Sequence, residues 1–338
     1  MELFDNLKLI ILLKRMTYSL FFFYKNIKTY PFYATWYRNS EIVKAYKNFL
    51  SKNKNISSKR KVLIQNLDKT SVKTVDTILA RIKKVLNSKA EKINCFTIKE
   101  KEQLGRLKLD FKNQIKKLDD NCYSYKEFLI PINHFESSVF YYEHQIHDID
   151  NLDYIKDKNI LDVGGFIGDS AIVLSKYTDA EVHTFEPEKE NYDLILKTIK
   201  MNNKSNIIPH KIGLGNKKEI LKLAVNNSAS TLIDTYLDTD NYEEINLTTL
   251  DEFIKDNPMN IGLIKVDVEG FEQQFLHGAK ETIKSQKPIL LISIYHSLED
   301  FFDIKPMIES WDLGYNFKIR KPIDGNISFE TLLICEPY

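Results

Sequence analysis

Three glycines follow an apolar run that ends in an acid in the stretch NILDVGGFIGDS, residues 159–170. Gly164, Gly165 and Gly168 stand within five positions, and Asp162 precedes them. Glycine leaves the backbone bare, which suits either a tightly packed turn between strand and helix or the close approach of a ligand. A helix that opens after such a turn also offers free N–H groups to that ligand.

A second acid lies at the end of the next apolar run, in HTFEPEKEN. Glu186 follows the glycine turn by about 20 residues, the distance at which a carboxylate meets a ribose in open α/β sheets. Such a carboxylate can accept hydrogen bonds from both ribose hydroxyls. The two segments together predict a nucleoside-bearing cofactor.

The glycine frame favours S-adenosylmethionine over a dinucleotide. It reads VGGFIG, without the first glycine of GxGxxG, and Asp162 stands two positions before Gly164. That carboxylate would repel a pyrophosphate but attract the ammonium and sulfonium groups of S-adenosylmethionine. The expected cofactor contacts are Asp162, Gly164, Gly165, Phe166, Gly168, Asp169, Glu186 and Asp267.

Two acids and a histidine at later strand ends could activate a nucleophile. Asp267 and Glu269, in KVDVEG, are two positions apart, so along a strand their side chains share a side. They could face the reacting methyl group or hold a divalent metal ion. The alternative is that Asp267 only orients the cofactor amine and Glu269 caps the helix opening at Gly270. His296, in ISIYHS, is our preferred general base because imidazole titrates near neutral pH, although a core or surface histidine is equally consistent.

Five further residues are weaker candidates. His134 and Glu136, in PINHFESSVFYYEH, could reach over the cofactor as part of a lid. Lys265 is expected to pair with a neighbouring acid. Ser230 and Thr231 could approach the cofactor after an inserted hairpin, but their spacing does not require it.

The elements that must position these residues alternate between short β-branched runs and amphipathic helices. This alternation predicts a doubly wound α/β sheet with helices on both faces. The last two strands follow one another without a helix, across the turn KPIDGN, and must be antiparallel. That arrangement is the one found in class I methyltransferases. The expected strands are 159–163, 181–185, 206–212, 262–267, 288–295, 315–320 and 331–336, and the expected helices are 168–177, 188–202, 271–285 and 299–311.

Charge divides the chain. Residues 1–120 hold 27 Lys and Arg against 11 Asp and Glu, a net charge of +16, whereas residues 121–338 hold 21 against 36, a net of −15. We expect a basic α-helical module over 1–120, a connecting or lid segment over 121–158 and the cofactor-binding domain over 159–338. The basic module could contact an anionic polymer or a membrane surface, or it could pair with the acidic part of the chain. Its clearest helical stripe is Val75, Ile78, Leu79, Ile82, Val85 and Leu86.

The first residues and the cysteines bear on location. The apolar and aromatic stretch over 7–40 is interrupted by Lys14, Arg15, Lys25 and Lys28, so it is too short to span a membrane, and it lacks a signal cleavage site. Membrane contact through an interfacial helix stays open.

The three cysteines, Cys95, Cys122 and Cys335, match no zinc spacing and indicate a reducing compartment without disulfides. We expect a cytoplasmic protein, with attachment to the periphery of the inner membrane as an alternative.

The motifs in order resemble the FkbM family of S-adenosylmethionine-dependent methyltransferases. They are DVGGFIGDS, FEPEKENYDLILKTIKMNN, LTTLDEFI and LIKVDVEGFEQQFLHGAKETI, and the resemblance covers about residues 130–338. ISIYHSLEDFFDI and the final strand with FET resemble the branch associated with bacterial glycan biosynthesis. Phe166 departs from the family, which often has Asn there. The resemblance implies methyl transfer to an oxygen, usually of a sugar or polyketide hydroxyl.

We therefore expect an O-methyltransferase whose acceptor is a carbohydrate. Other acceptors, a lipid or a peptide, are compatible with the same fold. A non-enzymatic alternative is a scaffold or glycan-binding module whose catalytic domain has lost its activity. Carboxylates at three strand ends argue against this alternative. A nucleic-acid substrate is disfavoured because the cofactor-binding part is acidic, whereas phosphate binding calls for a basic surface. The sequence leaves the oligomeric state open.

Overall fold

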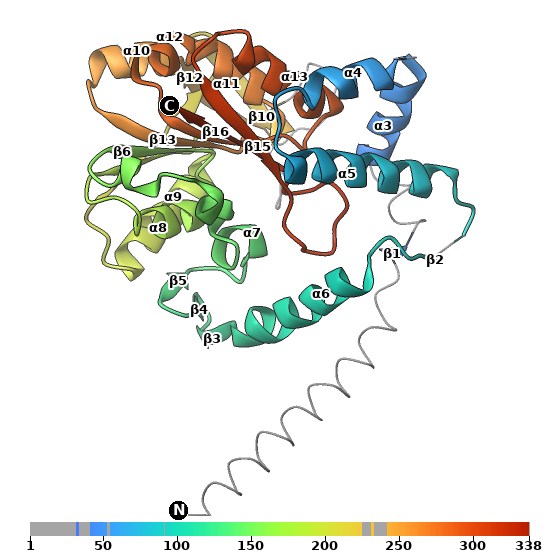
Figure 1. Ribbon diagram of the computed structural model, residues 1–338. Coiled ribbons are helices and arrows are strands. Elements are labelled where there is room, and N and C mark those ends of the chain that lie inside the picture. Colours follow the sequence, from blue (N-terminus) through green and yellow to red (C-terminus); the bar gives the residue numbers. More distant parts are fainter. Residues whose placement is uncertain are drawn as a thin grey trace, which may run out of the picture.

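The computed structural model describes residues 32–33, 41–52, 55–90, 92–224, 231–232 and 242–337. Its largest sheet has seven strands in the order β15-β16-β14-β13-β6-β7-β8 (Figure 1). Chain order reverses between β6 and β13, which is where open α/β sheets bind their ligands. The strands are β6 (Asn159–Val163), β7 (Val182–Phe185), β8 (Ile207–His210), β13 (Ile261–Val266), β14 (Ile289–Ser293), β15 (Tyr315–Arg320) and β16 (Leu332–Pro337).

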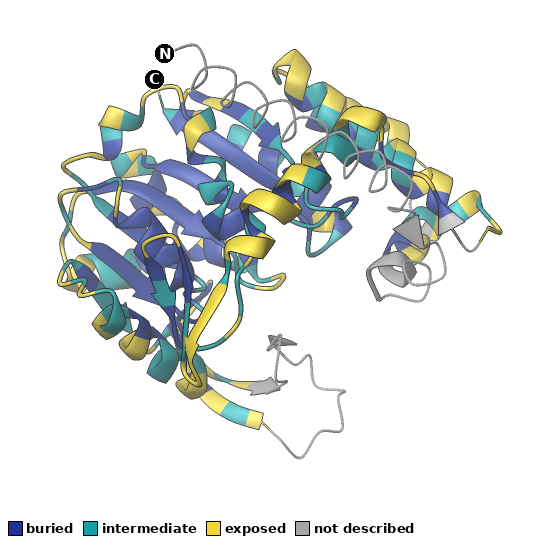
Figure 2. Ribbon diagram, turned by 90° about the horizontal axis from the view of Figure 1, so that it is seen from below, coloured by how far each residue is buried: buried dark blue, intermediate teal, exposed yellow. Residues whose placement is uncertain are grey.

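The strand directions confirm the predicted fold class. The five strands from β8 to β14 pair in parallel, and β16 is antiparallel to both β14 and β15. The connection between β15 and β16 covers residues 321–331, and so extends beyond the predicted turn. Every residue of β13 and β14 is buried, as expected for central parallel strands that are covered on both faces. Figure 2 shows the sheet as the buried centre of the molecule.

The helices of this part largely follow the predicted ranges. One difference is the predicted helix over 271–285, which is divided into two helices at Ala279. A helix before β13 was not predicted; it begins after Thr249, whose side chain accepts a hydrogen bond from the Glu252 N–H. The helices are α8 (Asp169–Leu174), α9 (Lys189–Met201), α10 (Leu250–Asp256), α11 (Glu272–Gly278), α12 (Lys280–Gln286) and α13 (Leu298–Glu309).

A second sheet between β8 and α10 was not predicted as such. Its order is β11-β10-β12-β9, with β10 antiparallel to both β11 and β12. The strands are β9 (Gly213–Leu214), β10 (Glu219–Ala224), β11 (Thr231–Leu232) and β12 (Tyr242–Thr248). Ser230 lies outside the described residues, and of Thr231 the backbone alone is described, so their predicted approach to the cofactor stays a prediction.

The N-terminal part is helical over most of its described length. The prediction of helix up to residue 120 is wrong at its end, where β3 begins a three-stranded antiparallel sheet with β4 and β5. The side chains of β3 are all exposed, so no apolar period marked it as a strand. The elements are β1 (Phe32–Tyr33), α3 (Glu41–Lys52), α4 (Ile56–Leu63), α5 (Lys69–Asn87), β2 (Lys92–Ile93), α6 (Ile98–Asp110), β3 (Lys116–Asp119), β4 (Cys122–Tyr125) and β5 (Phe128–Ile130).

Two N-terminal helices pack against the C-terminal part of the chain, one on the large sheet and one on α13. The first turn of α5 contacts the end of β15, and most of the predicted apolar stripe of α5 is buried (Figure 1). The buried hydroxyl of Ser71, on α5, accepts hydrogen bonds from the Ile319 N–H at 2.9 Å and from the Arg320 guanidinium at 2.8 Å. Helix α4 packs on α13, where Lys59 forms an ion pair with Asp303 at 2.7 Å. Part of the basic surface therefore pairs with the acidic part of the chain.

The stretch over 7–40 lies outside the described residues except for β1. Among the helices that the structure describes, none combines the length and apolar character needed to cross a membrane.

Candidate active site

A cavity of about 500 Å³ opens at the carboxyl ends of β6, β7 and β13. Its volume lies within the roughly 300–1,000 Å³ range of small-molecule sites. Its lining is acidic and partly aromatic: seven carboxylic side chains border it, together with Phe166, Phe185, Phe271 and Tyr295. The acids are Glu136, Asp169, Glu186, Glu188, Glu190, Asp267 and Glu269.

The glycine turn serves tight packing and ligand approach at the same time. A Cβ on Gly164, which has a φ of +84°, would lie 1.8 Å from the carbonyl oxygen of Asp267. A Cβ on Gly165 would lie 2.1 Å from Oγ1 of Thr184. Gly168, with a φ of +81°, precedes α8. Gly164 borders the cavity, whereas Gly165 and Gly168 do not; Gly165 lets the turn pack against β7, and Gly168 faces α9.

A buried polar ladder crosses the three central strands beneath the turn. The strand registers align Lys265 with Asp162 and Asp162 with Thr184. The Lys265 ammonium lies 3.0 Å from Asp162 Oδ1 and donates a hydrogen bond to the Gly164 carbonyl at 2.8 Å. The Thr184 hydroxyl donates to Asp162 Oδ2 at 2.9 Å. The structure thus places Asp162 below the cavity, with no exposed surface, where it holds Lys265, as predicted for that lysine.

Glu186 borders the cavity at the end of β7, as predicted. Its carboxylate accepts backbone N–H hydrogen bonds from Phe166 at 2.9 Å and from Glu188 at 3.0 Å. Burial raises the pKa of Glu186 to about 8, against the lowering effect of these two hydrogen bonds. The side chain is thereby fixed in position while still exposing an acceptor to a ligand in the cavity.

This pKa makes cofactor affinity depend on pH. Below a pH of about 8 the Glu186 carboxyl binds a proton, and ribose hydroxyls donate better to the ionised form. If S-adenosylmethionine binds only when Glu186 is ionised, its association constant should rise about tenfold for each pH unit below the pKa of Glu186. Above that pKa the association constant should be constant. Calorimetric titration of S-adenosylmethionine from about pH 6 to about pH 9 measures this. Glu186→Gln, which keeps the shape without the titration, should give a weaker but flatter profile; equal slopes in both proteins would contradict the assignment.

The predicted lid residues border the same cavity. His134 and Glu136 precede α7 (Ser137–Phe140), and the two side chains approach to 3.2 Å. The His134 ring packs against Phe166, with centroids 4.9 Å apart. Asp169 lies beneath them, and burial, aided by the negative charge of Glu136, raises its pKa to about 7. Together these groups could enclose the methionine part of the cofactor.

Asp267 and Glu269 line the cavity after β13. The Asp267 N–H donates to the Val163 carbonyl at 3.0 Å, which fixes the end of β13 against β6. Glu269, with a φ of +51°, exposes about half of its side chain. The predicted helix cap is not formed by Glu269, because α11 begins at Glu272 without a side-chain cap. Both acids are therefore available to a ligand in the cavity.

His296 lies behind these two acids rather than in the cavity lining. Its Nε2 is 3.4 Å from Asp267 Oδ1 and 3.5 Å from Glu269 Oε2, and its Nδ1 is 2.9 Å from Glu272 Oε1. Burial alone would lower the pKa of His296, but the three carboxylates, Glu272 foremost, raise it to about 10. A protonated imidazole cannot accept a proton, and His296 does not line the cavity, so both observations count against direct proton transfer to it; its role as the base stays a prediction.

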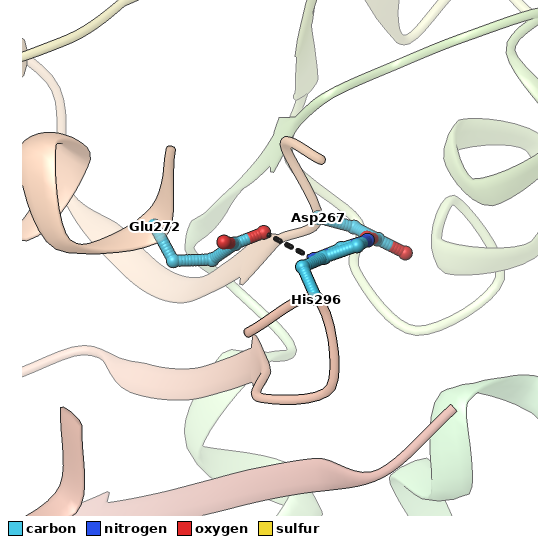
Figure 3. Close-up of side chains that lie close together, drawn as sticks. All are labelled: Asp267, Glu272 and His296. Atoms are coloured by element: carbon cyan, nitrogen blue, oxygen red, sulfur yellow. Dashed lines mark ion pairs between the residues drawn. The ribbon is translucent and has the colours of Figure 1, made fainter. Parts of the chain in front are cut away.

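Glu272 is the site residue that sequence reasoning missed. It is fully buried and accepts a hydrogen bond from the Val268 N–H at 3.0 Å. It lies opposite Asp267 across the His296 ring (Figure 3). Its place in the first turn of the helix after KVDVEG was a signal that could have drawn attention to it.

The mixed sheet with its antiparallel β16, and the cavity at the carboxyl ends of its central strands, define a class I methyltransferase fold. Residues 162–317 match the model of the Methyltransferase FkbM domain family. This part of the chain matches the methyltransferase domain of the FkbM family, a family of S-adenosylmethionine-dependent enzymes. The cavity volume, the acceptor at Glu186 and the carboxylates that could meet an ammonium group fit this cofactor.

Two known proteins show how far the likeness extends. "Methyltransferase 1" of Beauveria bassiana (strain ARSEF 2860) is 24% identical over 189 residues, which are 49% of this chain and 75% of that protein. The crystal structure of Methyltransferase FkbM from Methylobacillus flagellatus KT superimposes with a TM-score of 0.53 at 20% identity. That match covers 83% of this chain and 59% of the other, so the chain spans less than two thirds of that protein and the likeness shows the fold.

Proposed function

We propose that the protein transfers the methyl group of S-adenosylmethionine to a sugar hydroxyl of a bacterial glycan or glycan precursor. The observation that carries this proposal is the set of carboxylates beside the cofactor cavity, at Glu136, Asp267 and Glu269. Carboxylates accept hydrogen bonds, and a sugar presents several hydroxyl donors at once. Tyr295 adds an aromatic surface to the same wall.

The arrangement assigns roles to the residues of this chain. When bound, S-adenosylmethionine supplies an electrophilic methyl group whose bond to sulfur is exchanged for a bond to the acceptor oxygen. Glu186 holds the ribose, and the segment with His134 and Glu136 limits access of water. Glu136, Asp267 and Glu269 face the cavity, and one of these carboxylates takes the proton that the hydroxyl loses.

The charge of the cavity also bears on other acceptors. Seven acids line it, and Lys265, the lysine among the described lining residues, is already paired with Asp162. Phosphate groups would be repelled, which disfavours nucleic acid and favours a neutral acceptor. A lipid or peptide hydroxyl, or a cofactor-binding scaffold without turnover, is the alternative. We extend the proposal to a cytoplasmic location, with the basic residues 1–120 as the part that could meet an anionic polymer or a membrane surface.

Turnover tests the proposal. Labelled methyl transfer is measured with a panel of neutral sugars, matched with lipid and peptide hydroxyl acceptors. Glu269→Ala should lower kcat by about 10² or more, because the acceptor hydroxyl loses one of the carboxylates that face it, while cofactor affinity is retained. Glu281→Ala, which removes an exposed glutamate of α12, is the matched control and should change neither quantity. Cofactor binding without transfer to any acceptor class would favour the scaffold, and unchanged turnover in Glu269→Ala would remove that residue from the mechanism.

A further inference from the structure

The carboxylates around His296 outnumber the cations that face them. The ring lies between Glu272 and Asp267, with one nitrogen toward each (Figure 3), and Glu269 approaches the same nitrogen as Asp267. Three ionised acids carry three negative charges, and the imidazole can carry at most one positive charge. The nearby ammonium of Lys265 is held by Asp162 and by the Gly164 carbonyl. A further cation would balance this cluster.

The cluster also contains buried polar atoms without hydrogen bonds. His296 exposes 9% of its side chain, and neither ring nitrogen makes a hydrogen bond of good geometry. The second oxygen of Glu272, which has no exposed side-chain surface, is also without a partner. Unpaired buried polar groups cost free energy, and an ion bound at Nε2 would give that nitrogen a partner.

The spacing of the donor atoms suits one metal ion. Nε2 of His296 lies 3.4 Å from an oxygen of Asp267 and 3.5 Å from an oxygen of Glu269. Ligand atoms with metal bonds of about 2.1 Å stand roughly 3.0–3.4 Å apart when they are neighbours around one ion. Donor atoms of Asp267, Glu272 and His296 lie within 4.8 Å of one another, so Glu272 belongs to the same cluster. The carboxylate of Glu272, at Nδ1, is placed as the outer partner that orients a metal-binding histidine.

We propose that Nε2 of His296 and the carboxylates of Asp267 and Glu269 bind a divalent first-row transition-metal ion, with Glu272 fixing the histidine from its Nδ1 side. One imidazole nitrogen with two carboxylate oxygens is a mixed donor set that suits ions such as Mn²⁺ better than Ca²⁺. The ligating nitrogen must be free of its proton, so binding the ion releases any proton held there to solvent.

The position of this site deepens the proposed function, on which its catalytic role rests. Asp267 and Glu269 line the cavity, so an ion between them would face the acceptor. A sugar hydroxyl bound to the ion loses its proton more readily, and Glu136 on the same wall can receive that proton. The ion would thus supply the activation that a weakly nucleophilic hydroxyl needs.

Mn²⁺ binding to the purified full chain tests the proposal. After treatment with EDTA and dialysis, MnCl₂ is titrated and free Mn²⁺ is followed by electron paramagnetic resonance. Pulsed measurements on the bound ion detect coordinated nitrogen. We expect one Mn²⁺ per chain with a nitrogen signal, lost in His296→Gln, and affinity at least about tenfold weaker in Glu269→Gln. Glu269 is half exposed, so its substitution tests the site even if His296→Gln does not fold. Glu190→Gln removes another acid of the cavity wall and should leave Mn²⁺ binding unchanged.

The outcomes separate the ion from the enzyme activity. Absence of bound Mn²⁺ at millimolar concentration, or equal affinity in Glu269→Gln and the unaltered protein, would overturn the site. Methyl transfer that continues at full rate in EDTA would overturn the catalytic role of the ion and leave the methyltransferase proposal standing. Absence of methyl transfer with and without Mn²⁺, in a protein that binds the ion, would count against the proposed function instead.

Discussion

Alanine in place of Glu186 should weaken binding of S-adenosylmethionine roughly 100-fold, since two hydrogen bonds from ribose hydroxyls to a carboxylate are lost. The carboxylate is also held by the N–H groups of Phe166 and Glu188, so its removal loosens the turn that shapes the cavity. Isothermal calorimetry with S-adenosylmethionine and S-adenosylhomocysteine measures the effect, and both ligands should lose affinity alike because they share the ribose.

The matched control is Glu190→Ala. Glu190 lies on α9 and borders the same cavity, but it does not stand at the end of β7. Its substitution should change affinity much less than that of Glu186. Thermal unfolding of both variants separates loss of a ligand contact from loss of the fold. Equal affinities in Glu186→Ala and the unaltered protein would show that the ribose is held elsewhere.

Methionine in place of Lys265 should lower the free energy of unfolding by about 3–5 kcal/mol. The substitution leaves the charge of Asp162 without its partner in a site with no exposed side-chain surface. It also removes the hydrogen bond to the Gly164 carbonyl, which holds the glycine turn. Urea unfolding at neutral pH measures the loss.

The double variant Asp162→Asn, Lys265→Met tests the cause. It removes the unpaired charge, so it should recover part of the stability lost in Lys265→Met alone. Lys189→Met, at an exposed lysine of α9, should change the free energy of unfolding by about 0.5 kcal/mol or less. If Lys265→Met lowers the free energy of unfolding by less than about 1 kcal/mol, the stability of the fold does not depend on the ion pair between Lys265 and Asp162.

The features predicted well from the sequence are those that local composition determines. The central strands β13 and β14 are buried on both faces, so they read as unbroken apolar runs, and Glu186 and Asp267 mark strand ends. Polar residues at the ends of parallel strands gather at one edge of the sheet, whatever the strand order. The cavity lining at Glu186, Asp267 and Glu269 was therefore predictable.

The features that were missed depend on contacts between distant segments. Asp162 was predicted to touch the cofactor, but the register between β6 and β13 places Lys265 beside it and buries both. Glu272 belongs to the site because it contacts His296, which follows the end of β14 and is distant from Glu272 in the sequence. Strand β10 (EILKLA) and strand β12 (YEEINLT) lack a regular apolar alternation, and Ile220 and Tyr242 are exposed, which weakened their signal.

The contact between α5 and β15 has a consequence for association with other chains. Strand β15 is the last strand at its end of the sheet, and the outer strand of a sheet offers unpaired N–H groups to any extended peptide. The Ser71 hydroxyl accepts the N–H of Ile319, near the end of the strand, and the helix that carries Ser71 contacts β15 there. Helix α5 therefore occupies an outward N–H near the end of β15, so an added strand would have to displace this helix from that part of the edge.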